Sequence, residues 1–196
     1  RGLGDVYKRQ AYGVAVDGTG VYVVGYDKVG GDERWRIEKR SLLGLVLIWT
    51  VASDPSIRSD WADDVAVYGT GVYVVGSDRV LVNARWRIER RSPANGALLA
   101  APAVSNPSAG DDVAEDVAVG PTGVYVVGYD RVGGDARWRI EKRSLLGVAP
   151  IWAAVSDPSG GTDVAADVAV DGTGVYVVGY DMALGNARWR IEKRTL

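Results

Sequence analysis

Closely spaced carboxylates are the side chains of this sequence with the clearest capacity for chemistry. They lie in two acidic segments, 60–64 and 111–116. Paired carboxylates can act as general acid and general base. An enzyme needs one asymmetric site, however, and these segments are near-copies of each other. We therefore interpret them as solvated loops rich in turn-forming aspartate.

The residue types that most often accompany catalytic acids are missing. The chain has no His and no Cys. Without His it lacks the commonest general base near neutral pH and the commonest metal ligand. Without Cys it can form no disulfide, thiolate zinc site or thiol nucleophile. We expect no cofactor and a non-enzymatic protein, with a lyase or hydrolase as the least favoured class.

Charge and hydropathy exclude two further kinds of partner. The formal net charge is -2, whereas nucleic-acid binding usually requires a basic face. No apolar run approaches the roughly 18 residues of a membrane-spanning helix, so we expect a chain that does not cross a membrane. Gln occurs once and Asn is sparse, a composition that weakly favours a thermophile.

A fourfold repeat organises the chain. The stretch VAVDGTGVYVVG at 14–25 returns in close variants that start at 65, 117 and 168, at spacings of 51, 52 and 51 residues. A second block, RWRIEKR at 34–40, recurs in step with it. Self-similarity at this period is typical of repeat architectures, in which each unit is one supersecondary element.

Each unit is expected to form four strands. In the first unit these are a short strand at 14–16, a strand at 21–26 that is apolar on both faces, an alternating strand at 34–38 and an outer strand at 45–52. Pro102 and Pro150 lie in or beside the outer strand of later units, which marks an edge. The last unit reaches Leu196 without a fourth strand.

Four strands per repeat of this length, with no helical period, predict an all-β fold, a β-propeller with four visible four-stranded blades, the last lacking its outer strand. A β-solenoid is the main rival. We expect one propeller over 11–196, with blades at about 14–64, 65–116, 117–167 and 168–196. Residues 1–10 do not fit the repeat and resemble a translated transposon end from a sequencing library, so we interpret them as a non-native junction.

The units also resemble a known family of repeats. VAVDGTGVYVVGYD is similar to the β-propeller repeats of secreted and surface proteins of bacteria and archaea. That resemblance implies an extracellular or cell-surface location and a non-enzymatic role. The sequence departs from the pattern at Tyr68 and at Gly120–Pro121, where the first-turn aspartate is missing. A role that needs this aspartate in every blade is therefore in doubt.

Two sets of equivalent residues could bind ligands. One acidic residue ends the second strand of every unit and could contribute to a ring that holds a cation such as calcium, or could cap a turn; we favour caps and expect no metal site: Asp27, Asp78, Asp130 and Asp181. A tryptophan set could stack on sugars or bases, or could pack between blades, which we favour: Trp35, Trp86, Trp138 and Trp189.

The outer strands carry the leading functional hypothesis. Their apolar residues could form an edge that pairs with another chain: Leu45, Leu47, Trp49, Leu98, Leu99, Ile151 and Trp152. The missing strand of the last unit could come from the N-terminal segment, from a neighbouring copy, or be lost by truncation. We predict a non-enzymatic extracellular structural protein that associates with copies of itself, with a filament as one form of that association. The alternative is a monomeric binding module that recognises a glycan, a peptide or a cation through its divergent loops.

Overall fold

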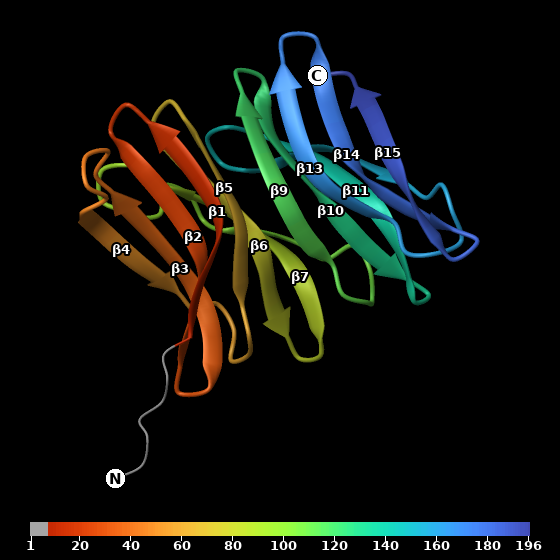
Figure 1. The fold of residues 1–196 in the computed structure, drawn as a ribbon, viewed down its shortest axis with the longest axis horizontal. Coiled ribbons are helices and arrows are strands. Elements are labelled where there is room, and N and C mark those ends of the chain that lie inside the picture. Colours follow the sequence, from red (N-terminus) through yellow and green to blue (C-terminus); the bar gives the residue numbers. More distant parts are fainter. Residues whose placement is uncertain (1–7) are drawn as a thin grey trace.

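The structure is a computed structural model that describes residues 8–196, and all of its regular elements there are β-strands. These form four separate antiparallel sheets that lie side by side in one row (Figure 1). Three sheets have four strands and the last has three. The all-β prediction and the missing outer strand of the last unit are confirmed. The predicted junction at 1–10 lies mostly outside the described residues.

In every sheet the strands are arranged in chain order, as expected for consecutive hairpins. The strands of the first two sheets are β1 (Arg9–Asp17), β2 (Gly20–Val29), β3 (Asp32–Arg40), β4 (Leu47–Ser53), β5 (Trp61–Tyr68), β6 (Gly71–Val80), β7 (Asn83–Arg91) and β8 (Ala103–Ser105). Those of the last two are β9 (Val113–Gly120), β10 (Gly123–Val132), β11 (Asp135–Arg143), β12 (Pro150–Ser156), β13 (Val164–Asp171), β14 (Gly174–Ala183) and β15 (Asn186–Arg194).

The first strand of each sheet is longer than the sequence indicated and contains the acidic segments. β5 begins at Trp61 and β9 at Val113, so most of 60–64 and 111–116 is strand. Asp60 and Asp112 are completely buried. The interpretation of these segments as solvated loops is therefore wrong. The physical reason is a register slip: the pairing of β5 with β6 jumps from Ala62 to Asp64, a β-bulge that hides the alternation of a strand.

The same bulge recurs in all four first strands. The residues that these register slips leave without a pairing partner on the second strand are Tyr12, Asp63, Glu115 and Ala166. A glycine lies opposite each bulge, because the first and second strands of the blade approach too closely there for a side chain. A Cβ on Gly128 would come within 2.1 Å of the Val113 carbonyl oxygen. Such bulges re-aim side chains and often lie next to functional sites.

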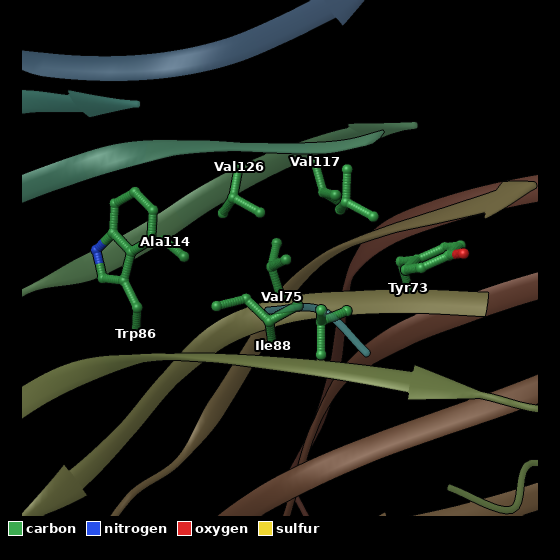
Figure 2. Packing of buried hydrophobic residues seen from close by; sticks show 9 residues of the cluster. Tyr73, Val75, Trp86, Ile88, Ala114, Val117 and Val126 are labelled. Carbon is green, nitrogen blue, oxygen red and sulfur yellow. The ribbon is translucent and has the colours of Figure 1, made fainter. Parts of the chain in front are cut away.

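The blades pack face to face through their first three strands. In the middle of the row, Val75, Trp86 and Ile88 of one blade meet Ala114, Val117 and Val126 of the next (Figure 2). Each buried indole also donates a hydrogen bond to a carbonyl oxygen of the next blade, as Trp86 Nε1 does to Tyr129 at 3.1 Å. Three of the four repeated tryptophans lie between blades as expected. The fourth, Trp189, is 96% exposed on the open face of the last blade.

Candidate functional site

The bulged segments of the first strands form the candidate site. The first strands of successive blades lie next to one another, β1 beside β5, β5 beside β9 and β9 beside β13. The fit is close, since a Cβ on Gly13 would come within 2.7 Å of the Asp64 Cα. The bulges therefore lie in a row across four blades. Because the bulge residues differ in type, this part of the repeat is asymmetric.

Asp63 is the most perturbed acid of this row. Burial, together with the nearby carboxyls of Glu115 and Asp64, raises the pKa of the Asp63 carboxyl well above its usual range. Its Oδ2 atom is enclosed by protein and has no hydrogen-bond partner among the residues that the structure describes. A raised pKa favours the protonated form of a carboxyl, and that form can donate one hydrogen bond and accept others.

Glu115 and two tyrosines surround this acid. Burial, with Asp116 next to it, raises the pKa of Glu115. Burial raises the pKa of Tyr12 and of Tyr129, with smaller contributions from nearby groups that include Asp63. The Tyr12 ring lies 5.8 Å from the ring of Tyr26 and is half exposed. We call Tyr12, Asp63, Glu115 and Tyr129 the bulge cluster.

A chain of three carboxyl groups runs beside the bulge cluster. Oδ2 of Asp64 accepts a hydrogen bond from the Val117 amide of the next blade at 3.2 Å, and Oδ2 of Asp116 accepts one from Val168 at 2.7 Å. The pKa of Asp116 is raised to about 7, mainly by burial and in addition by the hydrogen bond with Asp64 and the charge of that group. Its hydrogen bond with Asp167 raises the pKa of that group too. Asp116 is therefore the member of this chain that holds its proton up to about neutral pH.

The acids predicted as cation ligands or turn caps have a different role. Each accepts ion pairs from two arginines of its own blade, as Asp27 does from Arg34 Nε at 2.7 Å and from Arg36 at 3.1 Å. The other three are paired in the same way: Asp78, Asp130 and Asp181. Within 8–196, no cluster of three or more acids is arranged to hold a metal ion.

The predicted self-association residues lie on the outer strands and turns. Five are exposed: Leu45, Leu47, Leu98, Leu99 and Ile151. Two are half-buried, because the Trp49 ring packs on Tyr22 at 6.2 Å and the Trp152 ring on Tyr125 at 6.4 Å. Their part in association stays a prediction.

A signal for the bulge cluster was present in the sequence. Buried small residues lie three positions apart, at Ala62 and Val65 and again at Ala114 and Val117, with two acids between them. A regular strand would return to the same face after two positions. The extra residue indicates a bulge, and the change of residue type at that position from blade to blade indicates an asymmetric surface.

The comparisons with known proteins bear on the fold. No family model matches the chain, and no curated protein matches it. Among solved structures, the chain is similar to Bombyx mori GH32 beta-fructofuranosidase BmSUC1, with a TM-score of 0.52 and 12% identity over 96% of this chain and 51% of that one. The fold is a β-propeller. A mutant of the same protein in complex with sucrose matches with a TM-score of 0.49 and 11% identity over 88% of this chain and 43% of that one. The chain thus spans about half the length of the structures that it matches.

This likeness corrects two predictions. The chain was expected to be non-enzymatic and to be a structural protein that forms filaments. Both are wrong as inferences from the repeat, because an enzyme has the same fold. The physical reason lies in the bulges: Tyr, Asp, Glu and Ala at equivalent positions supply the asymmetry that the near-identical blades were expected to lack.

The structure has no helix, within 8–196, that is long and apolar enough to cross a membrane.

Proposed function

We propose that this chain is a β-propeller binding module that recognises a glycan through the bulge cluster. The observation that carries the proposal is the Asp63 carboxyl, which is buried and raised in pKa, and whose Oδ2 atom lacks a hydrogen-bond partner among the described residues. A buried polar atom without a partner is costly, and ligands that supply the partner offset that cost.

The chemistry of the bulge cluster suits hydroxyl groups better than ions. The raised pKa values of Asp63 and Glu115 favour protonated carboxyls, which offer donors and acceptors together, as a vicinal diol requires. Tyr12 presents a half-exposed ring next to them, and an apolar ring face with a polar rim is typical of sugar contacts. The surrounding acids disfavour phosphorylated and other anionic ligands.

The proposed location is outside the cell or at its surface. Support comes from the resemblance of the VAVDGTGVYVVGYD units to propeller repeats of secreted and surface proteins. A glycan ligand is compatible with that location.

The test is a glycan array of neutral oligosaccharides probed with the purified chain, followed by calorimetry with the best ligand. Asp63→Ala removes both the donor and the acceptor, so binding is expected to fall by about tenfold or more, as for a buried polar contact left unpaired. Alanine is compatible with this bulge, because Ala166 holds the equivalent position in the fourth blade. Asp157→Ala is the matched control, because Asp157 is an exposed aspartate in the loop that follows β12.

The outcomes separate the alternatives. Glycan binding that is lost in Asp63→Ala and kept in Asp157→Ala supports the proposal. Glycan binding that is unchanged in Asp63→Ala contradicts the site. A chain that binds no glycan but binds peptides on a parallel peptide array contradicts the ligand class.

A further inference from the structure

Trp61 is a second departure from the repeat on the first strands. Its position holds Val113 in β9 and Val164 in β13. The Trp61 indole Nε1 donates a hydrogen bond to Oε2 of Glu33 in the preceding blade at 2.9 Å, and the other three blades have alanine at the position of Glu33. Within 8–196, the two halves of this contact therefore meet only at the junction of the first two blades.

The ring of Trp61 belongs to the strand that carries Asp63. In blades 3 and 4 a valine of the first strand pairs with a tyrosine of the second, as Val113 does with Tyr129. In blade 2 the aromatic residue is on the first strand instead, and Trp61 pairs with Ser77. This exchange moves the ring to β5, two residues before Asp63. The ring and the Asp63 carboxyl therefore start from one short stretch of the same strand.

Polar groups lie at the edge of the Trp61 ring. Burial alone would raise the pKa of Glu33, but hydrogen bonds, led by that of Trp61, lower it below its ordinary value, so this carboxyl is ionised at neutral pH. Its Oε1 lies 3.4 Å from the Lys28 Nζ, and the Lys28 side chain is 37% exposed. Trp61 is half-buried, so part of its ring is open to a ligand. An apolar ring with an acceptor and a donor at its edge can stack on a sugar and bond to its hydroxyls.

This group of residues lies beside the bulge cluster. Burial makes the largest contribution to the raised pKa of Tyr12, and both Asp63 and Glu33 are close enough to this phenol to add to it. Glu33 in turn is held by Trp61 and Lys28. We call Trp61, Glu33 and Lys28 the Trp61 group. It extends the bulge cluster across the junction of the first two blades.

We propose that the Trp61 group is a second sugar subsite, and that the ligand of the bulge cluster is an oligosaccharide of two or more units. One unit bonds to Asp63, and the next stacks on the Trp61 indole with its hydroxyls on Glu33 and Lys28. The indole is fixed by its bond to Glu33 before the ligand arrives, which lowers the entropy cost of binding. This inference rests on the proposed function, because it names the class of glycan bound at the same site.

The experiment compares the best oligosaccharide from the array with its single-unit fragments by NMR titration of the purified chain. The variant is Trp61→Val, since valine holds this position in blades 3 and 4. It is expected to bind the oligosaccharide about tenfold or more weakly, as for the loss of an aromatic anchor, and to bind the fragment at Asp63 as the wild type does. Damage to the fold would weaken both ligands alike.

Two further variants complete the test. The double variant Trp61→Val/Ser77→Tyr restores the valine–tyrosine pair of blades 3 and 4, so it keeps the packing; it is expected to bind the oligosaccharide as weakly as Trp61→Val. Trp152→Val is the matched control, because Trp152 is also half-buried but lies on the outer strand β12, and it is expected to bind both ligands as the wild type does.

The outcomes separate this inference from the proposed function. Equal affinity of the wild type and Trp61→Val for the oligosaccharide overturns the second subsite alone. So does full recovery of that affinity in the double variant, which would show that Trp61 acts through packing. A wild-type chain that binds neither ligand overturns the proposed function and the second subsite with it.

Discussion

Replacement of Asp116 by asparagine tests the raised pKa of this carboxyl. Oδ1 of asparagine can still accept the Val168 amide, and its NH₂ can donate to Asp64 as the protonated acid does. Asparagine therefore imitates the protonated state at every pH. The wild-type carboxyl, by contrast, loses its proton near pH 7.

The magnitude follows from linkage. The pKa of Asp116 rises from 3.8 to about 7 in the folded state, and each pKa unit corresponds to about 1.4 kcal/mol. A raised acid pKa stabilises the fold fully below the unfolded value, and this contribution is lost as the pH rises through the folded value. Between pH 4 and pH 8 the loss is at most about 4 kcal/mol, and roughly 2 kcal/mol after solvent screening of a partly exposed group.

Urea unfolding followed by tryptophan fluorescence at pH 5 and at pH 8 measures this effect. The wild type is expected to lose stability between the two values, whereas Asp116→Asn loses less. At pH 8 the variant is expected to be more stable by roughly 2 kcal/mol, a midpoint shift of about 1 M urea. Equal losses in the two proteins between pH 5 and pH 8 would show that Asp116 does not titrate with a raised pKa in the folded chain.

Three further predictions concern the stability of the fold. Ile140→Ala is expected to cost about 2 to 5 kcal/mol because Ile140 is fully buried, whereas Ile191→Ala is expected to cost less than about 1 kcal/mol because Ile191 is 70% exposed; thermal unfolding compares them. Leu184 has a φ of 53°, where the equivalent Gly133 has 62°, so Leu184→Gly is expected to stabilise by about 0.5 to 1 kcal/mol, and a lower melting temperature would contradict this. Gly128→Ala is expected to cost about 3 kcal/mol or more, since its Cβ would lie 2.1 Å from the Val113 oxygen; unchanged urea unfolding would show that this strand pair can move apart.

The sequence was sufficient for the architecture because the repeat is local and regular. Four strands per unit follow from turn residues and from alternation such as that of Trp35 and Ile37 between arginines. The missing fourth strand of the last unit follows from the same count. Burial of Trp35, Trp86 and Trp138 between blades was predicted because identical side chains in successive repeats meet when the repeats stack.

The candidate site was not predicted, because it depends on a departure from regularity. Alternation rules assign Asp63 to a loop, since a bulge breaks the period of two. The partners of Asp27 also escaped prediction. Arg34 and Arg36 belong to the next strand, and that register becomes known once β2 pairs with β3. Long-range pairing of this kind decides which acids are neutralised by arginine and which remain buried without one.

Glycan binding at the bulge cluster is tested most directly by an NMR titration, in which the tyrosine-labelled chain is titrated with the best glycan from the array. Of the 10 tyrosines in the chain, Tyr12, Tyr26 and Tyr129 lie in or beside the bulge cluster. Glycan is expected to shift the signals of these three tyrosines. The signals of Tyr68, at the end of β5, and of Tyr176, beside the first turn of the last blade, are expected to stay in place. Shifts at Tyr68 or Tyr176 with none at Tyr12 and Tyr129 would contradict it.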